Sequence, residues 1–162
     1  MGAGKTTIGK KLAEQRGLHF VDSDHEIEAR TGVDIPFIFE KEGEEGFRKR
    51  EQCAIEELTQ RSGIVLATGG GAVLRPENRC HLKARGYVVY LHASVAQQYA
   101  RVERSDNRPL LAQGDRRETL ARLFAERDPL YREVADLVLD TDGKNAKQLA
   151  REIELAMEQG EV

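Results

Sequence analysis

The sequence contains no tryptophan, two cysteines and four prolines, and aromatic residues make up 6% of its 162 positions. Cys53 and Cys80 show no Cys-x-x-Cys spacing, which fits buried core thiols in a reducing compartment better than a disulfide or a metal site. No apolar run is long enough to span a bilayer, and the first residues lack the apolar stretch of a signal peptide. We therefore expect a cytoplasmic protein without membrane contacts.

An excess of charge of one sign is also lacking. The chain carries 25 Lys and Arg against 28 Asp and Glu, interspersed, for a net charge of −3. Such a surface has no field that attracts nucleic acid, so we expect no nucleic-acid partner. The length and a hydrophobic content of 40% predict one globular domain, residues 1–162. The four histidines lack metal-ligand spacing and are interpreted as structural.

Short apolar runs alternate with amphipathic segments along the chain. Strands are predicted at 18–21, 64–67, 87–91 and 137–139. Helices are predicted at 6–16, 24–30, 36–61, 76–85, 95–104, 116–134 and 146–157. Ser23 or Asp24 would cap the second helix. Gly43 and Gly46 would divide the third, and Pro129 would kink or break the sixth. The alternation predicts an α/β fold with a parallel sheet covered by helices on both faces, a three-layer sandwich.

The most informative motif stands at the beginning of the chain. Gly2-Ala3-Gly4-Lys5-Thr6-Thr7 matches the second half of a phosphate-binding loop, Gly-x-x-x-x-Gly-Lys-Ser/Thr. In such a loop, backbone N–H groups surround phosphate oxygens at the positive end of a helix. Lys5 would reach the β- and γ-phosphates, and Thr6 would offer its hydroxyl to Mg²⁺. A flexible tail is the alternative for this segment taken alone.

The first glycine of this pattern, and the strand that normally precedes it, would lie upstream of Met1. That strand is central in folds of this class, so four strands are visible and the central first strand is missing. Its absence would leave two neighbouring strands with unpaired backbone groups. The cost would exceed the roughly 5–15 kcal/mol by which a domain is stable. We therefore expect Met1 to be an internal residue of a longer protein, which an intact mass from the natural source would test.

Two further motifs follow predicted strands, so they would meet at one edge of the sheet. Asp22 and Asp24, two apart on an extended chain, would point the same way. One can hold Mg²⁺ through water and the other can accept the proton of a substrate hydroxyl, and one of them can also cap a helix. Gly69-Gly70-Gly71 would let the backbone approach a small polar ligand, with a tight turn as the alternative.

Two arginines lie in segments too apolar for an ordinary charged face. Arg48 follows a phenylalanine, and Arg127 opens Arg-Asp-Pro-Leu-Tyr. As a pair they can grip a substrate carboxylate in a bidentate manner, although each alone is also compatible with a surface arginine. The polar stretch around Arg104 and Arg108 is typical of a lid that closes over ATP and excludes water, with a surface loop as the alternative.

Taken together, these motifs resemble those of the shikimate kinase family, in order over nearly the whole chain. The similar segments are Gly2-Ala3-Gly4-Lys5-Thr6-Thr7, Asp22-Ser23-Asp24, Phe47-Arg48, Gly69-Gly70-Gly71, Arg108-Pro109-Leu110-Leu111 and Arg127-Asp128-Pro129-Leu130-Tyr131. The resemblance implies a P-loop NTPase fold of the nucleoside monophosphate kinase type. It implies transfer of the ATP γ-phosphoryl group to the 3-hydroxyl of shikimate, in aromatic amino acid biosynthesis, by a monomer.

The resemblance also implies a role for each matching residue. ATP would be bound by Gly2, Ala3, Gly4, Lys5, Thr6, Thr7, Arg104, Arg108 and Lys144, with Arg108 as the lid residue and Arg104 and Lys144 near adenine. Mg²⁺ would be bound by Thr6 directly and by Asp22 through water. Shikimate would be bound by Asp24, Arg48, Gly69, Gly70, Gly71 and Arg127, with Asp24 as the base and Glu51 supporting Arg48. The shikimate-binding helices would span about residues 32–61 and the lid about 105–117.

Two alternatives are open at this point. A related small-molecule kinase such as gluconate kinase would also use arginines for an acidic sugar. A truncated module that binds nucleotide or shikimate without turnover belongs to another class, and only the N-terminus favours it.

Overall fold

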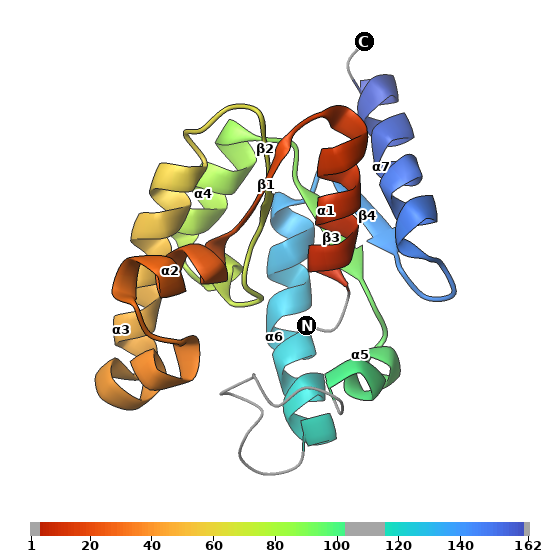
Figure 1. The fold of residues 1–162 in the computed structure, drawn as a ribbon. Coiled ribbons are helices and arrows are strands. Elements are labelled where there is room, and N and C mark those ends of the chain that lie inside the picture. Colours follow the sequence, from red (N-terminus) through yellow and green to blue (C-terminus); the bar gives the residue numbers. More distant parts are fainter. Residues whose placement is uncertain (1–3, 103–115, 161–162) are drawn as a thin grey trace.

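A computed structural model describes residues 4–102 and 116–160 (Figure 1). The helices are α1 (Lys5–Arg16), α2 (Ser23–Thr31), α3 (Ile35–Leu58), α4 (Pro76–Arg85), α5 (Val95–Val102), α6 (Arg116–Val134) and α7 (Ala146–Gly160), with a 3₁₀ turn η1 (Ala72–Leu74). The strands are β1 (His19–Asp22), β2 (Ile64–Ala67), β3 (Val89–His92) and β4 (Leu137–Asp140).

The strands form two parallel pairs. In the first, β1 pairs with β2 so that Asp22 lies opposite Ala67, and in the second, β3 pairs with β4 so that His92 lies opposite Asp140. Within the described residues no ladder joins one pair to the other. The predicted parallel α/β fold is confirmed, with two separate ladders in place of one continuous sheet.

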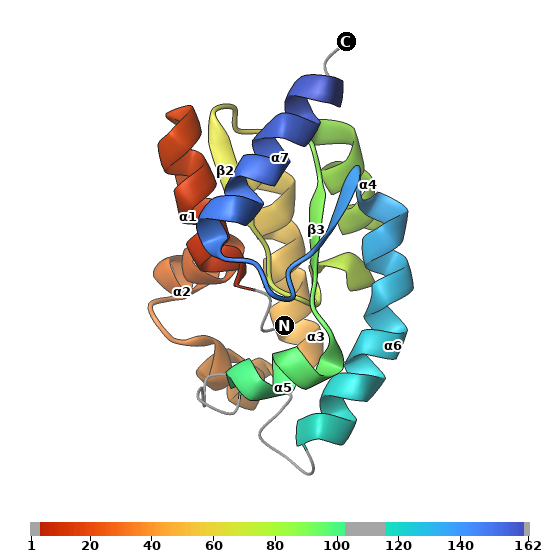
Figure 2. The ribbon, with the colours of Figure 1, turned by 90° about the vertical axis from the view of Figure 1, so that its right-hand side faces the viewer.

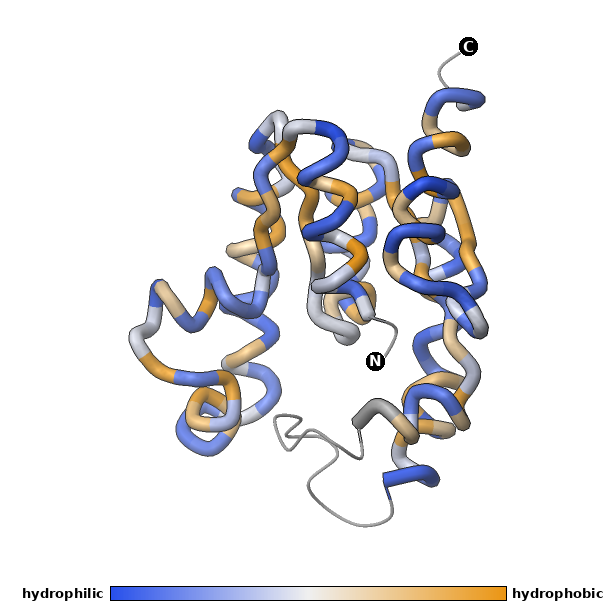
Figure 3. Tube along the Cα trace, turned by 45° about the vertical axis from the view of Figure 1, so that its right-hand side comes forward, coloured by the Kyte–Doolittle hydropathy of each residue, from blue (hydrophilic) through white to orange (hydrophobic). Residues whose placement is uncertain are grey.

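Helices cover the strands on two sides (Figures 1 and 2). One core lies under α1 and α7, where Ile8, Leu12, Leu149, Ala150 and Ile153 pack against apolar residues of β2, β3 and β4. A second core lies under α2 and α3, where Ile27, Ile38, Phe47, Ala54 and Leu58 pack against β1 and β2. Successive strand residues point to opposite faces, so Val65 joins the first core and Leu66 the second. Along the helices, hydrophobic and hydrophilic stretches alternate accordingly (Figure 3).

Local sequence signals located most element boundaries, with differences at the helix breaks. Gly43 adopts φ 72° and ψ −179° and interrupts the helical backbone of α3, as predicted. The chain is helical at Gly46, so Gly43 alone makes the single break that the two glycines predicted. Helix α6 continues through Pro129, so of the two predicted outcomes the break does not occur, and the kink stays a prediction. One proline removes a single backbone donor, and packing of the helix offsets that loss.

The prediction that both cysteines are buried is wrong. Cys53 on α3 and Cys80 on α4 are exposed free thiols. Cys53 precedes the buried residues Ala54 and Ile55, but the helical rotation of about 100° per residue turns its side chain away from the core. No helix in the described part of the chain combines the length and the apolar character needed to cross a membrane.

Candidate active site

The N-terminus of α1 is built as the phosphate motif predicts. Gly4 precedes the helix with φ 81° and ψ 27°, a left-handed conformation that favours glycine. Lys5, Thr6 and Thr7 then form the first helical turn, and both threonines are exposed. Free N–H groups at such a terminus attract an anion. Gly2 and Ala3 lie outside the described residues.

Asp22 and Asp24 occupy different kinds of backbone. Asp22 ends β1 and caps α2, where its Oδ1 accepts hydrogen bonds from the backbone N–H groups of Asp24 at 2.9 Å and His25 at 3.4 Å. The cap is therefore Asp22, and the prediction of Ser23 or Asp24 is wrong. Asp24 belongs to the first turn of α2, so the expected extended spacing of the two carboxylates is also wrong. Both still lie at the carboxyl end of β1.

The glycine turn directly after β2 lies against this acidic segment. The backbone N–H of Gly69 donates to the buried Ser23 hydroxyl at 3.3 Å. A Cβ atom added to Gly69 would lie 2.8 Å from Asp24 Oδ1 and 3.2 Å from Glu51 Oε2. One added to Gly71 would overlap the guanidinium of Arg48. The glycines are needed here because the protein's own charged side chains approach the backbone, a reason that the sequence motif did not reveal.

Arg48 and Glu51 form a buried ion pair on α3. Arg48 Nη1 donates to Glu51 Oε1 at 2.9 Å, and the two side chains are 8% and 1% exposed. Burial raises the pKa of the Glu51 carboxyl above its ordinary value, while Arg48 acts in the opposite direction. Asp24 and Arg127 also influence this pKa, Asp24 by raising it and Arg127 by lowering it. The four side chains therefore act as one charged cluster beside the glycine turn.

Arg127 brings a second buried guanidinium to this cluster from α6. Its exposure is 3%, and η1 contacts both α3 and α6. Within the described residues, Nε and Nη1 of Arg127 and Nε of Arg48 have no hydrogen-bond partner. Buried donors without partners are costly, and a carboxylate that accepts from two of them at once is a suitable partner. The pair can therefore hold a small carboxylic acid beside Asp24.

Other predicted site residues are not brought into this cluster. Arg104, Arg108 and most of the predicted lid, 105–117, lie outside the described residues. Lys144 Nζ pairs with Glu152 Oε1 at 3.1 Å at the beginning of α7. No group of three His, Cys, Asp or Glu side chains that could hold a metal ion occurs among residues 4–102 and 116–160. The oxygens of Thr6 and Asp22 suit Mg²⁺, which typically takes few protein ligands and completes its shell with phosphates and water.

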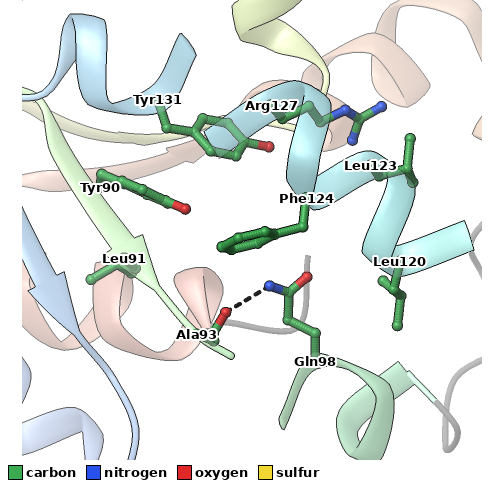
Figure 4. Close-up of a pocket in the computed structure, with 9 residues that line it drawn as sticks. All are labelled: Tyr90, Leu91, Ala93, Gln98, Leu120, Leu123, Phe124, Arg127 and Tyr131. Atoms are coloured by element: carbon green, nitrogen blue, oxygen red, sulfur yellow. Dashed lines mark hydrogen bonds between the residues drawn. The ribbon is translucent and has the colours of Figure 1, made fainter. Parts of the chain in front are cut away.

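Sequence reasoning gave Ser23 only a capping role, which is wrong, and gave Tyr131 no role. Ser23 holds the first residue of the glycine turn, and the Tyr131 hydroxyl donates to the carbonyl of Gly70. Figure 4 shows Tyr131 beside Tyr90, with Arg127 on the same helix. Tyr131 closes the Arg-Asp-Pro-Leu-Tyr motif, and this was the one signal that could have identified it.

Comparisons with known proteins agree with this geometry. The family profile described as shikimate kinase matches residues 1–158. A shikimate kinase of Pseudomonas syringae pv. tomato is 58% identical over 153 residues, covering 94% of this chain and 89% of the relative. A shikimate kinase of Halorhodospira halophila is 57% identical over 158 residues, covering 98% of this chain and 89% of the relative.

Solved structures give the same result. A shikimate kinase from Acinetobacter baumannii, solved in complex with shikimate, matches with a TM-score of 0.97 and 51% identity over 100% of this chain and 90% of that one. The shikimate kinase of Aquifex aeolicus matches with a TM-score of 0.87 and 33% identity over 100% of this chain and 94% of that one. The family profile, the relatives and the solved structures lead to one conclusion: the chain belongs to the shikimate kinase family.

Proposed function

We propose that the chain transfers the γ-phosphoryl group of ATP to the 3-hydroxyl of shikimate, forming shikimate 3-phosphate and ADP. The observation that carries this proposal is the pair of buried arginines, Arg48 and Arg127. Nε and Nη1 of Arg127 lack a hydrogen-bond partner among the described residues, as does Arg48 Nε, which faces Glu44 Oε2 at 3.8 Å, and such donors suit a carboxylate. Shikimate bears one carboxylate and several hydroxyls. A substrate held by its carboxylate at these arginines would place its hydroxyls towards Asp24, at the edge where α1 begins.

ATP would bind at the N-terminus of α1. The backbone N–H groups from Gly2 to Thr7 would bind the phosphates, and Lys5 would neutralise charge that develops on the transferred group. Thr6 and Asp22 would hold Mg²⁺, which neutralises charge on the β- and γ-phosphates when it is bound. Arg108 would close on the same phosphates, and Arg104 and Lys144 would lie near adenine.

Asp24 would accept the proton of the attacking hydroxyl, because its carboxylate lies within the charged cluster beside the glycine turn. Gly69, Gly70 and Gly71 would line the shikimate site, and Glu51 would keep Arg48 in place. Phosphoryl transfer depends mainly on positioning and charge neutralisation, so no covalent intermediate with the enzyme is required.

The proposal also covers domain organisation, oligomeric state and cellular location. We expect a single kinase domain, with shikimate-binding helices at about residues 32–61 and a lid at about 105–117, acting as a monomer. Two exposed free thiols fit a reducing compartment, so we propose that the enzyme works in the cytoplasm.

The test is ADP release by the chain in the presence of Mg²⁺ and ATP, with shikimate and with gluconate as separate acceptors. We expect ADP release with shikimate as the acceptor and none with gluconate. Release with gluconate but not with shikimate would favour the gluconate kinase alternative. Binding of ATP and shikimate without ADP release would favour the binding module.

A further inference from the structure

Tyr131 makes a long-range contact that the proposed reaction leaves without a role. It lies on α6, one turn after Arg127, so both side chains project from the same side of the helix. Its hydroxyl donates a hydrogen bond to the carbonyl oxygen of Gly70, 61 residues away in the chain. This bond links α6 directly to the glycine turn.

The contact fixes the orientation of one peptide unit in that turn. The carbonyl of Gly70 and the N–H of Gly71 belong to the same planar trans peptide and point in opposite directions. A donor that holds the carbonyl therefore also determines where the Gly71 N–H points. Gly71 is the residue whose backbone lies against the Arg48 guanidinium.

The same hydroxyl is also close to the second arginine. Burial raises the pKa of Tyr131, and the neighbouring Arg127 guanidinium lowers it in part. The ring of Tyr131 packs against that of Tyr90, with centroids 4.8 Å apart, and the Tyr90 hydroxyl donates to Asp128 Oδ1 at 2.7 Å. Tyr131 is therefore supported on one side by Tyr90 (Figure 4). Its hydroxyl bonds to the glycine turn.

On the basis of the proposed function, we propose that Tyr131 is a positioning residue for the shikimate carboxylate. By holding the Gly70 carbonyl from the helix that carries Arg127, it keeps the glycine turn, Arg48 and Arg127 in one fixed arrangement. It acts through these groups and takes no part in proton or phosphoryl transfer. A buried tyrosine that served only the core would also need a partner for its hydroxyl, so the test must separate positioning from stability.

The test compares Tyr131→Phe with Tyr90→Phe in the full chain. Each variant keeps its ring and loses one partly buried hydroxyl, but only the first hydroxyl touches the glycine turn. We expect Tyr131→Phe to raise the KM for shikimate about three- to tenfold, as the loss of one hydrogen bond would. The kcat and the KM for ATP should change little, and Tyr90→Phe should leave all three values near those of the wild type.

A second acceptor, which lacks the carboxylate, tests whether the effect of Tyr131 depends on that group. With a shikimate analogue whose carboxylate is reduced to a hydroxymethyl group, Tyr131→Phe should behave like the wild type. Partial unfolding of a variant lowers the apparent kcat and leaves both KM values unchanged, so the comparison of KM values also holds for a less stable variant. Such a variant is measured at a lower temperature, where more of it is folded.

An unchanged KM for shikimate in Tyr131→Phe would overturn the inference, as would an equal rise in both variants or a penalty that persists with the analogue. In each of these cases a wild-type protein that turns over shikimate leaves the proposed function intact. A wild-type protein that neither binds nor phosphorylates shikimate would overturn both.

Discussion

Glu51 is buried against Arg48, one helical turn earlier on α3, and this guanidinium is the strongest influence that favours the ionised form of the Glu51 carboxyl. Burial acts in the opposite direction and has the larger effect, so the pKa of Glu51 is raised overall. Each member of the pair therefore depends on the other to remain charged away from water. This dependence makes the site sensitive to changes that a surface pair would tolerate.

Replacing Arg48 with Met should make stability depend more strongly on pH. Without Arg48, burial would raise the pKa of Glu51 further above its value in the unfolded chain. When the pKa of an acid is raised in the folded state, the resulting stability is present at low pH and is lost as the pH rises through the raised pKa. Relative to the wild type, we expect the free energy of unfolding to fall by about 3–5 kcal/mol at neutral pH and by less near pH 5, measured by urea unfolding.

Arg50→Met is the matched control on the same helix. Arg50 Nε pairs with Glu42 Oε1 at 2.7 Å, but this pair is exposed to solvent. Its removal should change stability little and add no pH dependence. An equal loss at both pH values in Arg48→Met would contradict the role given to Glu51.

Replacing Asp24 with Asn should remove the base and keep the shape of the site. We expect kcat to fall by about 10²–10⁴-fold, with ATP binding nearly unchanged. Asp34→Asn is the control, since Asp34 caps α3 through the N–H of Phe37 and asparagine caps helices equally well. Steady-state kinetics and ATP titration measure the two effects, and an equal loss of turnover and ATP affinity would contradict the assignment.

Replacing Arg127 with Lys should weaken shikimate binding more than ATP binding. Lysine keeps the charge but cannot offer two parallel N–H donors to a carboxylate. We expect shikimate affinity to fall about tenfold or more, measured by calorimetry. Arg132→Lys, in the exposed pair with Asp128, should leave it unchanged. Wild-type shikimate affinity in Arg127→Lys would mean that the carboxylate is held elsewhere.

Replacing Gly71 with Ala should displace the Arg48 guanidinium. Gly71 has φ −89°, so alanine meets no backbone strain, and the effect comes from overlap with Arg48 alone. We expect the KM for shikimate to rise about ten- to a hundredfold, as expected for a lost charge-assisted contact. Gly86→Ala is the control, because nothing lies within 4 Å of its Cβ position. Similar kinetics for the two variants would show that Arg48 does not bind the substrate.

Local patterns explain which parts of the fold were predictable. The limits of β2, α4 and α6 follow from apolar runs, a proline at the first helical position and helical periodicity, all of which act over a few residues. The interruption at Gly43 was also visible locally. The cap at Asp22 was not, because three successive polar residues each satisfy the rule and only the backbone path selects one.

The sequence by itself determined the order of strands and helices, the start of α1 at a phosphate-loop motif and the identity of the charged residues at the proposed site. Only the tertiary structure decided which of them meet. Gly69 contacts Ser23 across 46 residues and Tyr131 reaches Gly70 across 61, and such contacts depend on how α2, α3 and α6 pack around one turn. Hydrophobic burial, which drives that packing, is not directional, so a local pattern specifies each element but not the partners that its side chains will find.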